Sequence, residues 1–213
     1  GESKTALDFD TITVHIKAPD QTHGRNIALP GCVVTNFSWA ADINTDGGQY
    51  KWSATLQSGV KPNALNQTNS GSTAYANSTN FFLASATATK AMDVDVALQS
   101  FTMTIDNPAV FVGSKLDGTG YDIINRAAEC AVTIDYQVKY DENTDTFINE
   151  FDTQDGQPSA TNCFLITASN AGGVNIQNAV FTNVAMSEGD IMMLDCSMKV
   201  IDDGTDSLVV LDN

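Results

Sequence analysis

The residues best placed for chemistry are oxygen-bearing side chains at alternate positions. Asp42, Asn44 and Asp46, followed by Gly47, match the D-x-N-x-D-G opening of a calcium loop. In such a loop alternate oxygen ligands surround the ion and glycine permits a sharp turn. Its twelfth position should be Glu, but here it is Ser53. Because Asp-Gly-Gly between two amphipathic segments also suits a β-hairpin, the sequence favours a turn, with Asp42, Asn44 and Asp46 as weak metal candidates.

Catalytic motifs are missing from the sequence. It contains no G-x-S-x-G, H-E-x-x-H, G-x-G-x-x-G or G-x-x-x-x-G-K-[ST] pattern. Neither histidine, His15 or His23, accompanies a Ser or Cys in a recognisable signature. Carboxylate pairs such as Asp93 with Asp95 arise by chance among 26 Asp and Glu residues. We therefore expect no enzymatic activity and no cofactor.

The four cysteines have no spacing typical of zinc or redox sites. They are Cys32, Cys130, Cys163 and Cys196. Cys130 and Cys196 share strand parity with apolar neighbours, which predicts buried thiols. Two disulfides in an oxidising compartment are the alternative.

Charge excludes several classes of protein. The 213 residues include 10 Lys and Arg against 26 Asp and Glu, a net charge of -16. External nucleic-acid binders and peripheral membrane proteins need basic surfaces, so this net charge argues against both classes. A membrane-spanning helix is also excluded, because no apolar run approaches the ~20 residues that it requires. Because charged residues make up only 17% and hydrophobic residues 42%, the chain should fold rather than be disordered. Residues 141–213 hold 13 of the acids and one base, Lys199.

Segments in which apolar and polar residues alternate dominate the chain, and they must position the oxygen-bearing side chains named above. Apolar residues alternate with polar ones in the segments 11–17, 33–43, 50–57, 131–140 and 192–200. Alternation predicts antiparallel strands with one solvated face. In Met92–Ile105 the apolar positions change parity near Gln99 and Ser100, which predicts a bulge or a strand that passes between two sheets.

Helices and long loops complete the predicted organisation. Asn143–Phe151 places three apolar residues on one side and predicts one short helix, and Asp122–Ala128 predicts a second helical turn. Asn107–Tyr121, with three glycines, predicts an irregular excursion. The uncharged segment Pro62–Thr89 is too long for an ordinary connection inside a domain, so it predicts a functional loop.

Three blocks of sequence together resemble the tail tube (major tail) proteins of long-tailed, non-contractile bacteriophages. They are LPGCVVTNFSWAADI (29–43), the block beginning LQSFTMTIDNPAVFVGSKLDG (98–147), and NIQNAVFTNVAMSEGDIMMLDCSMKVIDD (175–203). Their order resembles that family's and covers roughly two thirds of the chain. The resemblance implies an antiparallel β-sandwich or barrel with one flanking helix, like type VI secretion tube proteins. It also implies a single tube-forming domain over 31–213, preceded by an arm over 1–30.

The resemblance further implies a structural protein of the virion tail, assembled in the host cytoplasm into stacked, hexameric rings. Tape-measure, terminator and tip proteins would be partners, viral DNA would pass through without specific binding, and no membrane would be involved. The segment 60–90 would contact the next ring, with Asn66, Tyr75, Phe81 and Phe82 as candidates. Acids on wet strand faces would line the lumen: Asp93, Asp95, Asp135 and Asp195. The alternative is a secreted or cell-surface β-sandwich that binds calcium or carbohydrate.

Overall fold

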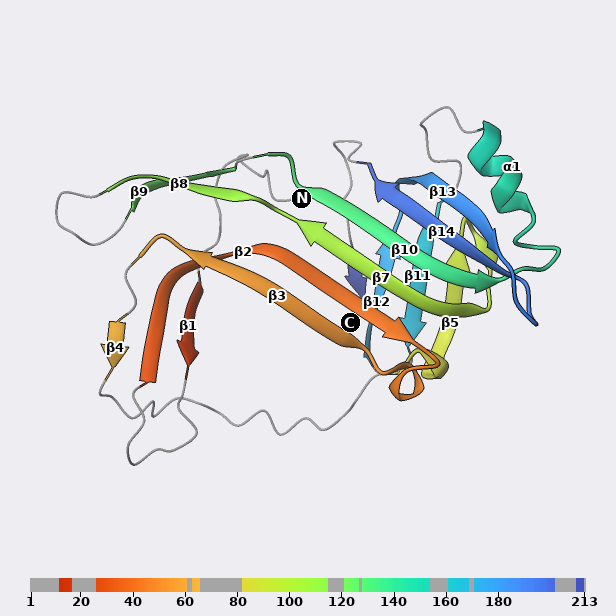
Figure 1. The fold of residues 1–213 in the computed structure, drawn as a ribbon, viewed down its shortest axis with the longest axis horizontal. Coiled ribbons are helices and arrows are strands. Elements are labelled where there is room, and N and C mark those ends of the chain that lie inside the picture. The colour runs from red at the N-terminus through yellow and green to blue at the C-terminus, as the bar shows by residue number, and fades with distance from the viewer. Residues whose placement is uncertain are drawn as a thin grey trace. The chain divides into compact units, whose positions relative to one another are not determined.

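Antiparallel β-strands and one short α-helix make up most of the described structure (Figure 1). This computed structural model describes residues 12–16, 26–60, 63–65, 82–114, 121–126, 128–153, 161–168, 171–201 and 210–212. Its strands are β1 (Ile12–Ile16), β2 (Asn26–Asp42), β3 (Lys51–Ser58), β4 (Asn63–Leu65), β5 (Ala86–Ala91), β6 (Val94–Asp95), β7 (Leu98–Asp106), β8 (Ala109–Ser114), β9 (Tyr121–Arg126), β10 (Ala131–Lys139), β11 (Phe164–Ala168), β12 (Ala171–Ile176), β13 (Ala179–Ser187), β14 (Met193–Val200) and β15 (Val210–Asp212). The helical elements are the 3-10 turns η1 (Asp46–Gly48) and η2 (Leu83–Ser85) and the helix α1 (Thr146–Thr153). The predicted fold class is confirmed.

The chain divides into two units. Unit 1 comprises Gly1–Phe37, Ala54–Ser78 and Asp106–Cys130, and unit 2 comprises Ser38–Ser53, Thr79–Ile105 and Ala131–Asn213. The division made from the sequence, an arm over 1–30 and one domain over 31–213, stays a prediction.

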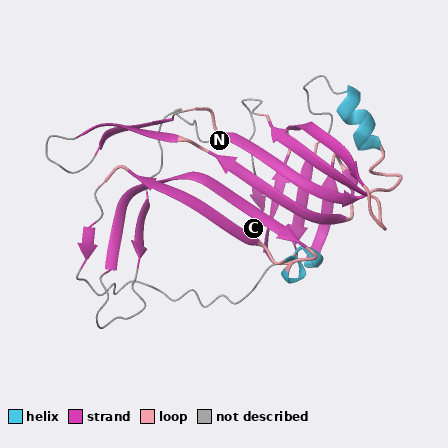
Figure 2. Ribbon diagram, viewed as in Figure 1, coloured by secondary structure: helices cyan, strands magenta, loops and turns pink. Residues whose placement is uncertain are grey.

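Two open sheets supply the core of unit 2 (Figure 2). The larger sheet has the order β1-β2-β7-β10-β14-β13, with β3 and β4 also paired to β2, and the smaller has the order β15-β12-β11-β5-β6. In the smaller sheet, β5 and β11 pair antiparallel with Ala91 opposite Phe164. The Phe164 ring lies 5.8 Å from that of Phe101 in β7 and 5.3 Å from that of Tyr136 in β10, measured between centroids. Side chains of both sheets therefore share one core, as in a sandwich.

The alternation of polar and apolar residues explains how each strand lies. In β10 the buried residues are Val132, Ile134, Tyr136 and Val138, and the intervening ones are exposed or half-buried. The period of two places every second side chain on one face of a strand. The five predicted strands are present as β1, β2, β3, β10 and β14. The prediction of a single solvated face is wrong for β3, in which Trp52 is 73% and Leu56 39% exposed.

The parity change in Met92–Ile105 marks a crossing between the two sheets of unit 2. The Val96 amide donates to the Thr89 carbonyl of the smaller sheet at 3.1 Å. The next carbonyl, that of Ala97, accepts from the Lys139 amide of the larger sheet at 3.0 Å. The predicted passage from one sheet to the other is therefore present, but at Val96 and Ala97, ahead of the predicted position near Gln99.

The predicted short helix is α1, which begins at Thr146 and ends at Thr153. A side-chain turn occupies the residues before it, because Asp141 Oδ1 accepts from the Asn143 amide at 3.0 Å. Such Asx turns compete with helical hydrogen bonding. Phe147 is buried, and its ring lies 5.6 Å from that of Phe181 in β13. This apolar contact holds α1 against β13.

Two predictions for the segment after β7 are wrong. Asp122–Ala128 forms no helical turn, since Tyr121–Arg126 is strand β9. The predicted irregular excursion contains strand β8, and β8 and β9 pair from Ala109↔Arg126 to Ser114↔Tyr121. Pairing with a neighbouring strand overrides local helix signals, and β-branched residues in both segments suit such a ribbon.

All four cysteines lie in the described part of the chain and none forms a disulfide. Cys32, Cys163 and Cys196 are buried as predicted, whereas Cys130 is half-buried because it lies just before β10 begins. Burial raises the pKa of the Cys163 thiol and raises the pKa of Cys196 to about 12. These two thiols stay protonated and packed rather than reactive.

Candidate functional site

The solvated face of the larger sheet in unit 2 is the candidate site. In the antiparallel pair β10–β14, Asp135 lies opposite Ser197 and Gln137 lies opposite Asp195. The Ser197 hydroxyl donates to Asp135 Oδ1 at 2.6 Å, and Gln137 Nε2 donates to Asp195 Oδ1 at 2.7 Å. Directly opposite residues share a face of the sheet. Two of the four predicted lumen acids, Asp135 and Asp195, are thus brought together.

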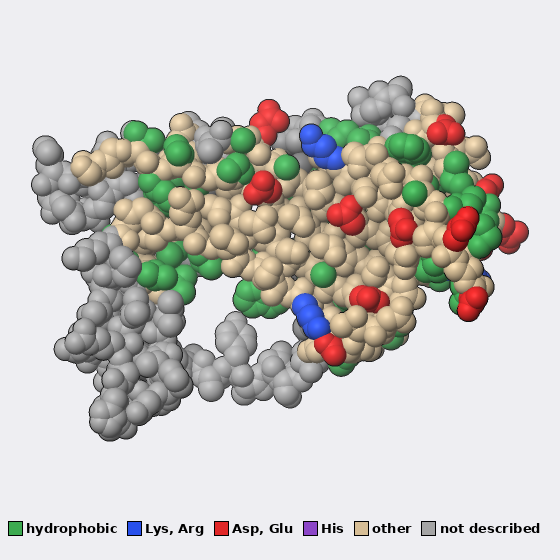
Figure 3. All heavy atoms as spheres, viewed as in Figure 1, with side chains coloured by type: hydrophobic (Ala, Val, Ile, Leu, Met, Phe, Trp, Pro, Cys, Tyr) green, Lys and Arg blue, Asp and Glu red, His purple; other side chains and the backbone are tan. Residues whose placement is uncertain are grey.

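Shallow hollows mark this face. One, of about 220 Å³, has Ser100 and Thr102 of β7 along one side and the Asp135, Gln137, Asp195 and Ser197 set along the other. A second, of about 320 Å³, shares the same β7 residues and includes Asp42, Thr45, Gln49 and Lys51. Figure 3 shows a face on which polar side chains and backbone predominate, with few charged groups between them. Such a surface can hold water and ions.

Sequence reasoning missed the hydroxyl and amide partners of these acids. Ser100, Thr102, Gln137 and Ser197 line the hollow beside Asp135 and Asp195. The available signal was their alternation with buried residues of the same strands. What the sequence could not supply was the register that places β10 and β14 opposite one another.

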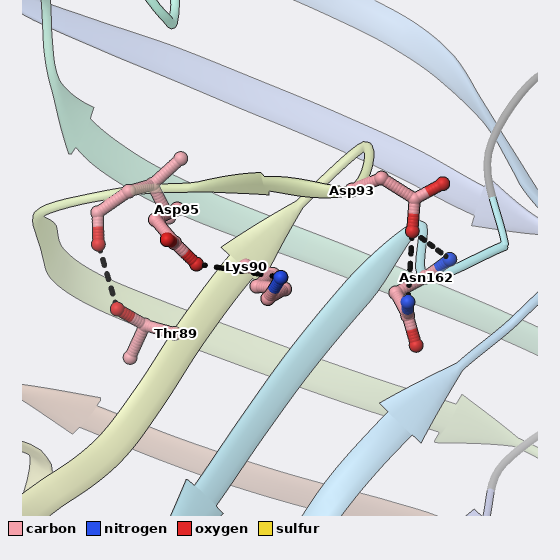
Figure 4. Close-up of polar contacts among 6 residues, drawn as sticks. Thr89, Lys90, Asp93, Asp95 and Asn162 are labelled. Carbon is pink, nitrogen blue, oxygen red and sulfur yellow. Dashed lines mark hydrogen bonds and ion pairs between the residues drawn. The ribbon is translucent and has the colours of Figure 1, made fainter.

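Asp93 lies elsewhere, in the two-residue turn between β5 and β6 (Figure 4). Its carboxylate accepts from the Thr161 amide at 2.7 Å, from the Asn162 amide at 2.9 Å and from Asn162 Nδ2 at 2.8 Å. These hydrogen bonds, led by that from Thr161, lower the pKa of Asp93. Met92 and Asp93 both have positive φ, of 49° and 64°, as a type I′ hairpin turn requires. Asp93 therefore clamps this turn to the chain that leads into β11.

Asp95 completes the same hairpin. It pairs with Lys90 across β5 and β6, with 3.5 Å between Lys90 Nζ and Asp95 Oδ1 (Figure 4). The hairpin is at the β6 end of the smaller sheet. The four predicted lumen acids consequently occupy two separate places in unit 2, and a role in the lumen stays a prediction for each.

We expect replacement of Asp93 to destabilise the fold in a pH-dependent way. Asp93→Ala removes three hydrogen bonds to a carboxylate, a loss of about 1–2 kcal/mol once solvent exposure is allowed for. Because the pKa in the folded state is lowered from its ordinary value of 3.8, the carboxylate stabilises the fold above about pH 4. That contribution is lost as the pH falls through the folded-state pKa. Urea unfolding at pH 7 and at pH 3 measures the difference.

A neighbouring acid supplies the control for this experiment. Asp95→Ala removes an exposed ion pair, which contributes roughly 0.2–1 kcal/mol. Equal losses for Asp93→Ala and Asp95→Ala, or a loss for Asp93→Ala that persists unchanged at pH 3, would contradict the clamp.

The weak calcium candidates lie in the hairpin turn between β2 and β3. Asp42 Oδ1 accepts from the Asn44 amide at 2.8 Å, and Asp42 Oδ2 accepts from the Thr45 hydroxyl at 3.3 Å. Asp46 forms an ion pair with Lys51. The predicted turn is therefore present, and its carboxylates bind groups of this chain. No cluster of three or more His, Cys, Asp or Glu suited to a metal occurs among the described residues.

Most of the predicted inter-ring loop falls outside the described residues. Asn66, Tyr75 and Phe81 lie there. Phe82 is half-buried, forms a β-bridge with Gln49 and accepts through its carbonyl from the Ser85 amide at 2.9 Å. This end of the loop is thus attached to the β2–β3 turn of unit 2, and its part in assembly stays a prediction. Within the described residues, no helix has the length and apolar character needed to cross a membrane.

Fold and site together define a class: an antiparallel β-protein that presents a broad polar sheet face. The sequence profile of the family described as "Phage tail tube protein" matches residues 4–200. The chain belongs to this family, so it is a structural protein of a phage tail, as the resemblance implied. That family assignment also favours a structural protein over an enzyme and over the calcium- or carbohydrate-binding alternative.

Two solved structures are similar to the chain. One is a chain of the virion of a native gene transfer agent particle, with 12% identity and a TM-score of 0.34, covering 63% of this chain and 89% of that one. The other comes from the tail of an empty gene transfer agent particle refined with C6 symmetry, with 12% identity, a TM-score of 0.34 and coverage of 63% and 87%. No curated protein matches the sequence.

Proposed function

We propose that the chain assembles into stacked rings that form the tail tube and that the polar face of the larger sheet lines its lumen. Membership in the tail tube family is the observation that carries the proposal. The tube would conduct the genome out of the virion. It would enclose the tape-measure protein, meet terminator and tip proteins at its ends, and assemble in the host cytoplasm.

The open edges of the larger sheet support ring formation. Among the described strands of unit 2, the sheet ends at β13 on one side and at β3, which pairs with β2, on the other. Exposed edge strands template pairing with another chain. In β3, Trp52 is 73% exposed, which is costly for a protein that stays monomeric. Two different edges per chain give a head-to-tail contact, and such contacts close into rings.

Charge placement on the polar face supports passage of DNA without retention. Lys139 lies opposite Met193 at one end of the β10–β14 pair, and Lys199 lies opposite Thr133 at the other end. Asp135 and Asp195 lie between these two lysines. At about 3.4 Å per residue the two lysines are roughly 20 Å apart along the strands. Phosphates are gripped by clustered Lys and Arg. Isolated lysines with acids between them offer no continuous basic strip.

We expect Asp135→Lys with Asp195→Lys to slow the release of DNA. The exchange replaces two acids by bases and joins Lys139 and Lys199 into a basic strip. The DNA should then be retained in the tube, and less so at high salt, because each phosphate that a lysine neutralises releases counterions. Negative-stain electron microscopy first tests whether the purified chain forms rings or tubes of uniform diameter. Genome release from particles that carry the variant then tests the lining.

A charge-matched variant controls for net charge. Asp152→Lys with Glu129→Lys changes the same number of acids outside the polar face. If both variants release DNA at the unmodified rate, this face does not line the lumen. If the unmodified chain forms no rings or tubes, self-assembly itself is contradicted.

A further inference from the structure

Three large apolar side chains are exposed at one end of the larger sheet in unit 2. Met186, Ile191 and Met192 are 49%, 64% and 47% exposed. They belong to the β13–β14 connection and the residues beside it, and we call them the tip patch. Met186 lies opposite Leu194, so it faces the same side of the sheet as Met192, two residues before Leu194. Clustered exposed apolar residues mark interaction sites, whereas scattered ones do not.

Carboxylates are carried by the two turns that adjoin the tip patch. Met193 lies opposite Lys139 on one side and opposite Ser187 on the other, and the Tyr140 amide donates to the Met192 carbonyl at 3.0 Å. The turn after β10 therefore adjoins the β13–β14 connection. The acids of these two turns are Asp141, Glu142, Asp145, Glu188 and Asp190. Figure 3 shows apolar and acidic side chains together where Figure 1 labels α1 and the nearby strand ends.

One base, Lys139 at the end of β10, adjoins this rim and lies opposite Met193. The sequence has no Lys or Arg from residue 140 to residue 198. Unit 2 holds 18 acids and 4 bases, whereas unit 1 holds 8 acids and 6 bases. Two of the bases of unit 2, Lys51 and Lys90, are already paired with Asp46 and Asp95. A second copy can approach the tip patch with least repulsion through its own unit 1.

Unit 1 contains an exposed apolar face in the ribbon formed by β8 and β9. Val110 and Val112 are 44% and 49% exposed, and because they are two residues apart in β8 they share a face. The ribbon is a sheet of two strands among the described residues. A two-stranded ribbon is only marginally stable in water and gains stability when another element covers it. This face thus fits an apolar partner.

We propose that the tip patch of one copy docks on the β8–β9 ribbon of a second copy. The inference rests on the proposed self-assembly and names the surfaces that meet in it. Both surfaces are apolar at their centres, and the acidic rim meets the unit that carries most of the bases. The contact joins different surfaces of identical chains, so it repeats from copy to copy instead of ending in a pair.

A suppressor experiment tests the docking. Val110→Glu with Val112→Glu places two acids on the ribbon, opposite the acidic rim, and should lower the assembled fraction about tenfold or more. Glu188→Lys with Asp190→Lys, added to the same chain, should restore assembly because the new lysines face the new glutamates. Negative-stain electron microscopy and size-exclusion chromatography measure the assembled fraction. Circular dichroism checks that each variant folds.

The control suppressor has equal charge but another location. Asp46→Lys with Asp95→Lys also exchanges two exposed acids of unit 2, outside the rim. If it restores assembly as well as the rim variant does, or if the ribbon variant assembles normally, the docking is overturned. If the unmodified chain does not assemble, the proposed function fails, and this inference fails with it.

Discussion

Phe101→Ala should lower the free energy of unfolding by about 3–5 kcal/mol, the usual loss for a buried phenylalanine. The Phe101 side chain is 2% exposed. Its ring centroid lies 5.8 Å from Trp39, 5.9 Å from Tyr50 and 5.8 Å from Phe164. Because Phe164 belongs to the smaller sheet, the cavity would open between the two sheets of unit 2. Urea unfolding monitored by tryptophan fluorescence measures the loss, as a lower midpoint at unchanged slope.

An exposed apolar residue provides the comparison. Ile191→Ala also shortens a side chain, but Ile191 is 64% exposed, so its free energy of unfolding should stay within about 0.5 kcal/mol. A loss below about 1 kcal/mol for Phe101→Ala, or equal losses for both variants, would show that Phe101 does not join the sheets.

Gly173→Ala should cost about 3 kcal/mol, at the upper end of the range for overpacked cores. A Cβ at this position would lie 2.2 Å from the Ile166 carbonyl oxygen and 3.2 Å from Thr167 Cα. Both atoms belong to the backbone, so no side-chain rotation relieves the clash. The β11–β12 register is irregular here, between Ile166 and Ala168, which brings the two backbones together. Thermal unfolding followed by circular dichroism measures the shift in midpoint.

A second glycine provides the control for Gly173. In the β13–β14 connection, a Cβ at Gly189 would meet nothing closer than the Ile191 carbonyl oxygen at 3.5 Å. Gly189→Ala should therefore be neutral or stabilise the fold by up to about 1 kcal/mol, because it restricts the unfolded chain. A Gly173→Ala variant as stable as Gly189→Ala would contradict the close approach of β11 and β12.

Local pattern predicted the strands and the helix because burial on one face leaves a direct periodic signal. The alternation around Tyr136 and the parity change near Gln99 both correspond to observed geometry. The β8–β9 ribbon was missed because its glycines favoured a loop and Asp122–Ala128 favoured a helix locally. Only the pairing of Ala109 with Arg126 reveals two strands there.

The candidate site was less predictable than the fold. Strand parity placed Asp135 and Asp195 on wet faces, but their proximity depends on a register between segments about sixty positions apart. Asp93 was grouped with them by residue type. Its hydrogen bonds to Thr161 and Asn162 give it a structural role at the β5–β6 turn instead. Such distant partners leave no trace in the local sequence.

The pairing of β5 with β11 bears on how fast the chain folds. Ala91 lies opposite Phe164, and Thr133 lies opposite Lys199, so long loops must close before these contacts form. Domains dominated by such distant pairings fold in roughly milliseconds to seconds, far more slowly than helical bundles. A newly made subunit therefore spends that time with unpaired strands that can associate wrongly. The supply of subunits that are ready to assemble then depends on how fast each chain folds.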